Sequence, residues 1–272
     1  MRLSVNRLVT GLFVLTLTVG GWAGGAPARA QSAPAVADYF VDQAGKPYLL
    51  LDDARLVTAN PLGRNRFEFF DSSLGGPTTV DVSDPFAILL FYPDYGTVVT
   101  LDRTLSEIAR TDLFALDDVL EPSAVAGASD RGLWVYDAWD YRLKLLDPNG
   151  RTRLATNDLR LELDLTDAPV AVYVDRGRVL LHYAGRLAVF TNFGRFERWV
   201  ELPAADRFAW SAPFLTGTGP AGFWTYRTGE IRARPQVQGR VGLKATVAGG
   251  VTYQLNEAQQ LEVLSPASPE RR

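Results

Sequence analysis

The sequence predicts an all-β protein built from repeated units of four short strands. Three landmarks recur in the same order along the 272 residues. A proline comes first, an apolar run ends at a tyrosine about fourteen residues later, and a polar turn of the Asp-Pro or Asn-Pro type follows. Because Gly, Pro, Asn and Asp separate the apolar runs, the units are predicted to be β-meanders and not helical repeats.

The tyrosines divide the chain into six units. Their intervals are 43 to 47 residues, except for 27 residues between the last two; they are Tyr48, Tyr92, Tyr136, Tyr183, Tyr226 and Tyr253. The prolines that precede five of them are Pro34, Pro77, Pro122, Pro169 and Pro213. The short last interval indicates that the fifth and sixth units are compressed, and five units are the alternative.

The second predicted strand of the third unit is apolar on both of its faces. Leu133 and Val135 point one way, and Trp134 and Tyr136 point the other. A sheet that is buried on both faces needs a neighbour on each side. Packing such sheets around an axis meets this need for every unit and leaves only short outer edges. The sequence therefore predicts a β-propeller, with six blades, over residues 31–266.

The third unit carries the fullest set of landmarks, namely Pro122, Gly132, Asp137, Arg142 and the turn at 147–150. Over residues 121–152 this pattern resembles the NHL-type repeat of β-propellers. It departs from the family at Tyr141, where that family usually has Asn. The resemblance implies an architecture and hardly any particular activity.

The two ends of the chain are predicted to lie outside the propeller. Residues 1–30 have the basic start, short apolar run and small-residue site of a secretory signal peptide, with cleavage after Ala30. The alternative is an uncleaved membrane anchor, for which the apolar run is short. We therefore expect a periplasmic or secreted protein, with no transmembrane segment after cleavage. Residues 267–272 are predicted to be a disordered tail, and residues 31–41 are predicted to close the ring as an outer strand of the last blade.

Composition excludes several classes of function. The chain has no Cys, which excludes disulfides and a thiolate nucleophile. Its 28 Lys and Arg against 31 Asp and Glu give a net charge of −3. Residues 1–30 hold three of the arginines and no acid, so the mature chain is more acidic still. A net negative field argues against binding nucleic acid. We expect a monomer.

Catalytic and metal-binding signals are weak. The single histidine, His182, falls at an inward position of a predicted blade interface and is interpreted as a core imidazole. Oxygen ligands that suit Ca²⁺ are plentiful, but no EF-hand loop pattern occurs. We predict no catalytic residue and no cofactor, with Ca²⁺ as an alternative that no motif supports. Small and apolar first strands, expected at 123–129, 170–174 and 214–219, also argue against catalysis.

The most informative cluster is aromatic. The loops after the second strands contain YPDYG at 92–96, DAWDYR at 137–142 and YRTGE at 226–230. Equivalent loops of a propeller gather at one end, so the predicted binding residues are Asp94, Tyr95, Trp139, Asp140, Tyr141 and Arg227.

We expect a non-catalytic module that binds a protein or another cell-envelope ligand through this face. One alternative is that the rings pack back over the strand ends. Another is a propeller hydrolase or lyase, either metal-dependent and lactonase-like or carboxylate-based and glycosidase-like.

Overall fold

The computed structural model describes residues 34–59, 66–165, 167–220, 222–236, 244–256 and 261–264. The predicted signal peptide and the predicted tail lie outside these residues. The described residues belong to one compact unit. Among the described residues, no helix is both long and apolar enough to cross a membrane.

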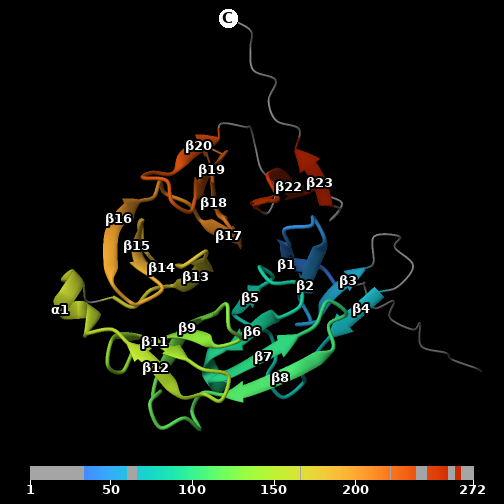
Figure 1. The fold of residues 1–272 in the computed structure, drawn as a ribbon. Coiled ribbons are helices and arrows are strands. Elements are labelled where there is room, and N and C mark those ends of the chain that lie inside the picture. The colour runs from blue at the N-terminus through green and yellow to red at the C-terminus, as the bar shows by residue number, and fades with distance from the viewer. Residues whose placement is uncertain are drawn as a thin grey trace, which may run out of the picture. The chain divides into compact units, whose positions relative to one another are not determined.

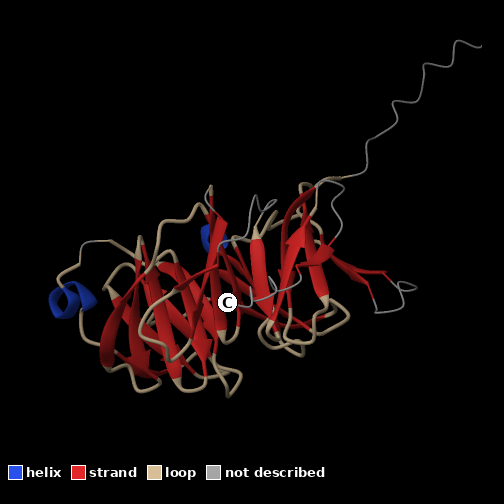
Figure 2. Cartoon of the chain, turned by 90° about the horizontal axis from the view of Figure 1, so that it is seen from above, coloured by secondary structure: helices blue, strands red, loops and turns tan. Residues whose placement is uncertain are grey.

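Six antiparallel sheets follow one another along the chain (Figure 1). Blade one has β1 (Val36–Val41), β2 (Pro47–Leu51), β3 (Leu56–Ala59) and β4 (Arg66–Phe69); blade two has β5 (Thr79–Asp81), β6 (Ile88–Tyr92), β7 (Thr97–Leu101) and β8 (Glu107–Asp112); blade three has β9 (Pro122–Gly127), β10 (Leu133–Asp137), β11 (Arg142–Leu146) and β12 (Thr152–Ala155). Blade four has β13 (Ala171–Asp175), β14 (Arg178–Tyr183), β15 (Arg186–Thr191) and β16 (Phe196–Glu201); blade five has β17 (Arg207–Ser211), β18 (Phe214–Gly219), β19 (Gly222–Arg227) and β20 (Arg234–Gln236); blade six has β21 (Ala245–Ala248), β22 (Val251–Leu255) and β23 (Leu261–Leu264). The helical segments are short, namely η1 (Pro93–Tyr95) and α1 (Leu159–Leu163), as Figure 2 also shows.

The blades pack face against face, as the two-sided apolar strands predict. Trp134 and Tyr136 of β10 belong to a buried cluster shared with β14 and β15 of blade four. Val135, on the other face of β10, belongs to a cluster shared with Phe91 of blade two. The hydrophobic clusters thus lie between neighbouring blades. The predicted fold, a six-bladed β-propeller, is confirmed.

Antiparallel strands give the propeller two ends, which we call front and back. The front end carries the loops from second to third strands and the connections between blades. Both kinds of segment touch there: the Leu113 N–H donates to the Gly96 carbonyl at 2.8 Å, and the Ala138 N–H donates to the Glu121 carbonyl at 2.8 Å. The back end carries the loops from first to second and from third to fourth strands.

The strand order of the fifth blade differs from the prediction. Tyr226 lies in the third strand, β19, and not in the second, so the segment 214–219 is the second strand and the first strand is β17. In this blade a large aromatic side chain of the third strand lies against a glycine of the second strand. Gly217 of β18 faces Trp224 of β19, and a Cβ atom at Gly217 would collide with the indole ring. Tyr226 stands in a third strand, whereas the other five tyrosines end or lie in second strands. This difference, and not a shortened fifth blade, produces the short tyrosine interval.

The predicted ring closure is wrong for the described residues 36–41. β1 pairs with β2 in its own blade and not with the sheet of β21, β22 and β23. Tyr39 and Val41 of β1 are fully buried against blade six, which an outer edge strand would not allow. Polar contacts add to this apolar contact between blades one and six: the Tyr39 hydroxyl donates to the Lys244 carbonyl at 2.6 Å, and Lys244 Nζ lies 2.6 Å from Asp38 Oδ1.

Candidate functional site

The structure brings five of the six predicted binding residues to the front end of blades two and three. Asp94 and Tyr95 lie in η1, between β6 and β7, and residues 138–141 link β10 to β11. Arg227 does not join them. It ends the third strand β19 and pairs with Phe214 at the start of β18, which places it at the back end. The error follows from the misplaced strand order of blade five.

Tyr95 is held on a short, well-defined turn. Pro93 begins η1 with a suitable backbone angle, and Gly96 ends it in the left-handed conformation with φ of 56°. The ring of Phe114, from the connection between blades two and three, rests on this glycine. A Cβ atom at Gly96 would lie 2.7 Å from that ring. The Tyr95 side chain stays 49% exposed.

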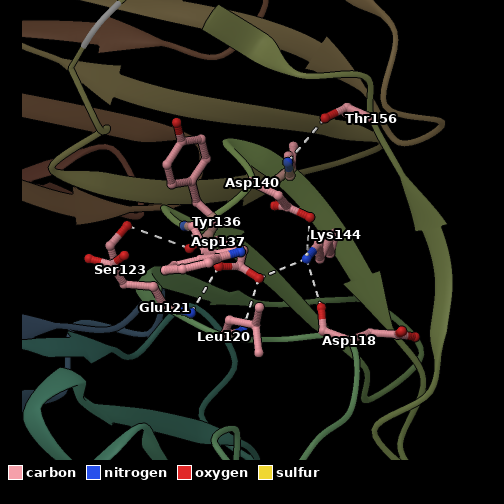
Figure 3. A network of polar contacts seen from close by, with 11 residues as sticks. Asp118, Leu120, Glu121, Ser123, Tyr136, Asp137, Asp140, Lys144 and Thr156 are labelled. Atoms are coloured by element: carbon pink, nitrogen blue, oxygen red, sulfur yellow. Dashed lines mark hydrogen bonds and ion pairs between the residues drawn. The ribbon is translucent and has the colours of Figure 1, made fainter.

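A buried carboxylate ties the two neighbouring front segments together (Figure 3). Asp137 ends β10 and is 0% exposed. It accepts hydrogen bonds from the backbone N–H groups of Leu120 at 3.0 Å, Glu121 at 2.9 Å and Trp139 at 3.1 Å. One side chain thereby satisfies backbone donors of both the inter-blade connection and the loop that carries Trp139.

Lys144 of β11 completes the network from the next strand. Its Nζ donates to Asp137 Oδ2 at 2.7 Å and to the backbone carbonyl of Asp118 at 2.7 Å. It also forms an ion pair with Asp140 Oδ2 at 2.7 Å. Figure 3 shows Asp118, Asp137 and Asp140 around the ammonium group.

The charges of this network persist because each one is compensated. Burial alone would raise the pKa of Asp137, but hydrogen bonds from Lys144 and from the backbone amides hold that pKa below its usual value. Burial alone would lower the pKa of Lys144, but the hydrogen bonds to Asp137 and Asp140 raise it above its usual value. The ionised pair is therefore the stable form at neutral pH.

The loop residues differ in exposure. Trp139 is 66% exposed, whereas the Tyr141 ring is covered by the Arg160 guanidinium, 3.7 Å from the ring centre. Asp158 holds this arginine through a hydrogen bond of 2.7 Å. For Tyr141 the alternative interpretation, a ring that packs over strand ends, fits the structure. Asp140 is partly buried and serves Lys144.

Two exposed side chains at this face come from the connection 113–121, where the sequence predicts no binding residue. Phe114 is 51% and Leu120 56% exposed. The signal was present in the sequence as DLFALDDVLE, residues 112–121, where apolar and acidic residues mix without a strand or helix period. We call the following set the acidic aromatic patch: Tyr95, Phe114, Leu120 and Trp139, with the acids Asp94, Asp112, Asp117, Asp118, Glu121 and Asp140.

Exposed apolar side chains concentrate at the front end of the described chain. Besides the patch, Phe70, Leu161 and Val170 are exposed in front-end connections. The back-end loops expose Phe86, Phe193 and Ile231. An exposed group of large apolar residues on one side is typical of a surface that binds a partner.

His182 lies where the sequence predicts, buried at a blade interface. Its Nδ1 is 3.3 Å from the Tyr173 hydroxyl, and its ring meets the Phe208 ring edge to face at 4.4 Å. Burial lowers the pKa of His182 to about 4. The imidazole is therefore neutral at pH 7 and packs in the core between blades four and five.

A cleft of about 420 Å³ opens at the back end between blades three and four. Trp134, Leu154 and Val174 contribute apolar surface to its lining. Two of its charged lining residues, Arg153 and Asp130, form an ion pair with each other. Within the described residues, no group of three or more His, Asp or Glu is placed to hold a metal ion.

Comparisons with known proteins support the fold. No family model and no curated protein matches the chain. A streptogramin B lyase structure matches with 12% identity and a TM-score of 0.51, covering 85% of this chain and 82% of that one. The extracellular domain of BT4673 from B. thetaiotaomicron matches with 10% identity and a TM-score of 0.51, covering 80% of this chain and 32% of that one. At these identities the likeness shows the fold alone.

Proposed function

We propose that this chain is an exported, non-catalytic propeller of NHL-type repeats that binds a protein partner through the acidic aromatic patch. The observation that carries the proposal is that large apolar side chains are exposed on a backbone that is firmly held. Asp137 and Lys144 bind two of the three segments that present them, namely 112–121 and 138–141. The third segment, 93–96, is tied to the first by the hydrogen bond from the Leu113 N–H to the Gly96 carbonyl. A surface ordered before binding loses less entropy when a partner docks.

The place of action follows from the sequence. The predicted signal peptide directs the chain to the periplasm or the exterior, and BT4673, which shares the fold, is described as having an extracellular domain. Aromatic side chains are enriched at the centres of protein interfaces, and Tyr95 and Trp139 are of this type. We therefore propose a cell-envelope protein as the partner class.

The test compares two triple variants of the full mature chain. Tyr95→Ala/Leu120→Ala/Trp139→Ala removes exposed apolar surface from the patch. Phe86→Ala/Phe193→Ala/Ile231→Ala removes exposed apolar side chains from the back end and serves as the control. All of these side chains are exposed, so both variants should melt within about 2–4 °C of the native chain.

Immobilised protein is then incubated with an envelope extract from the organism that makes it, and the retained proteins are compared by mass spectrometry. We expect a partner that the native chain and the back-end variant retain and the patch variant loses. Retention by the patch variant equal to that of the native chain would show that this face does not bind the partner.

The hydrolase or lyase alternative needs several acidic groups that converge on one site. The residues that line the back-end cleft include one carboxylate, Asp130, which is already ion-paired with Arg153. No observation in the described residues favours this alternative over binding.

A further inference from the structure

The acidic aromatic patch carries charge of one sign. Its three segments, 93–96, 112–121 and 138–141, contain six acidic residues and no Lys or Arg. Five of the acids are exposed and Asp140 is partly buried. A partner that approaches the exposed rings of Tyr95 and Trp139 must therefore come close to several carboxylates.

Nearby cations are mostly committed elsewhere. Lys144 is buried and bound to Asp137 and Asp140. Arg110, in the outer strand β8, is ion-paired with Asp71 and Glu107. Arg142, the exposed residue that follows Tyr141, stands at the edge of the patch.

The exposed carboxylates themselves form no ion pair among the described residues. These carboxylates are Asp94, Asp112, Asp117, Asp118 and Glu121. Asp112 accepts hydrogen bonds from the backbone N–H groups of Phe114 and Ala115, which carry no net charge. Uncompensated charges of like sign on one surface raise the local potential and attract opposite charge, and salt weakens this attraction.

Apolar surface inside an acidic surround limits the chemistry of the occupant. An acidic peptide would gain from the rings but would be repelled by the carboxylates, which costs affinity. A basic but otherwise polar segment would satisfy the carboxylates and leave the rings exposed. A Lys or Arg side chain also gains energy when its charged group lies over an exposed Tyr or Trp ring.

From this combination we propose that the patch binds a cationic apolar protein segment, in which Lys or Arg alternates with aromatic or branched aliphatic residues. This inference rests on the proposed function and names the partner's chemistry. The cations neutralise the carboxylates of 112–121 and 138–141, and the apolar residues cover Phe114, Leu120 and Trp139. A second copy of this chain is the competing occupant, and it is an outcome of the test.

The probes are three synthetic peptides of equal length. One alternates Lys with Phe, one alternates Glu with Phe, and one alternates Lys with Ser. Binding to the full mature chain is measured by isothermal titration calorimetry at low and at high salt. We expect the Lys–Phe peptide to bind at least about tenfold more tightly than either other peptide, and its affinity to fall as salt screens the charges.

Two matched charge variants test whether the carboxylates of the patch are the ones that bind the Lys–Phe peptide. Asp117→Asn/Asp118→Asn/Glu121→Gln removes three charges from the patch. Asp52→Asn/Glu201→Gln/Asp206→Asn removes three charges from exposed residues at or near the front end of other blades. We expect about a tenfold loss of Lys–Phe affinity in the first variant and near-native affinity in the second.

The inference is overturned if the Glu–Phe peptide binds as well as the Lys–Phe peptide, or if both charge variants weaken binding equally. It is also overturned if sedimentation shows self-association that the patch charge variant abolishes, since the occupant is then a second copy. These outcomes differ from a failure of the proposed function, in which the Tyr95→Ala/Leu120→Ala/Trp139→Ala variant still retains the native partner.

Discussion

Asp137 and Lys144 form a buried ion pair, with Oδ2 and Nζ 2.7 Å apart, at the loop end of the β10–β11 hairpin. Replacing a buried ion pair by apolar residues is often neutral for stability, so the pair alone is weak evidence of a stabilising role. Its hydrogen bonds to Leu120, Glu121, Trp139 and the Asp118 carbonyl give it a second role. The pair positions two of the three segments that carry the acidic aromatic patch, 112–121 and 138–141.

Lys144→Met should destabilise the protein by about 3–5 kcal/mol, because Asp137 would remain buried as an uncompensated charge. Urea unfolding followed by circular dichroism measures the loss. The double variant Asp137→Asn/Lys144→Met contains no buried charge at this site and should regain most of it. If Lys144→Met costs less than about 1 kcal/mol, within the range of exposed pairs, the network does not anchor these segments.

Gly96→Ala should displace Phe114 and loosen the connection 113–121. The glycine has a positive φ of 56°, and a Cβ atom would lie 2.7 Å from the Phe114 ring. Gly185→Ala is the matched control, because Gly185 also has a positive φ in a loop between second and third strands and a Cβ there would meet nothing within 4 Å.

The backbone strain is common to both glycine variants, at about 1 kcal/mol each, so the excess loss of stability in Gly96→Ala measures the contact with Phe114. Hydrogen exchange of the Leu113 amide, which donates to the Gly96 carbonyl, should accelerate in Gly96→Ala alone. Equal stability and equal exchange in the two variants would contradict the contact.

The sequence was sufficient for the fold because its strongest signal is local. Strands such as β10, with apolar residues on both faces, need partners on both sides, and only a few architectures supply them. The number of blades could also be predicted, since one tyrosine in each blade is enough to count six. Where the tyrosine stands in a third strand, as Tyr226 does in β19, the sequence predicts the wrong strand order. The rank of a strand in its blade is set by which strands pair with it, and a single landmark residue does not encode that pairing.

The site was less predictable for a related reason. Tyr95 and Trp139 lie in loops of equivalent position, so the sequence alone brought them to one end. Phe114 and Leu120 lie in an irregular connection whose path is set by hydrogen bonds to Asp137, and no period in the sequence encodes those bonds. Tyr141 was expected to be exposed because nothing in the sequence marked Arg160 as the residue that covers it.

The stability of the native protein should fall between pH 6.5 and pH 4 in part because of His182. Burial lowers its folded-state pKa from the ordinary 6.5 to about 4, so folding favours the neutral ring. This contribution is fully present above pH 6.5 and is lost as the pH falls through about 4, which amounts to about 3 kcal/mol.

His182→Gln keeps a neutral polar side chain beside Tyr173 and does not titrate. Urea unfolding of both proteins at several pH values between 7 and 4 should show a shallower decline for the variant. Parallel declines would mean that His182 is not neutral and buried as described.

The interface between blades five and six should be the most sensitive to loss of a hydroxyl group. The buried N–H of Ala245 in β21 donates to Thr218 Oγ1 of β18 at 2.8 Å, and the Val247 N–H donates to Thr216 Oγ1 at 3.3 Å. Thr218→Val fills the same volume but leaves the Ala245 N–H without its acceptor, which should cost about 1–3 kcal/mol. Thr218→Ser keeps the acceptor and loses one methyl group. A larger loss of stability in Thr218→Ser than in Thr218→Val would therefore show that packing, and not the hydrogen bond, joins these blades.

Hydrogen exchange locates the weakened interface. In Thr218→Val the amides of β21 should exchange with solvent faster than those of β9, because the blade that opens first is the one whose inner strand has lost a bond to its neighbour.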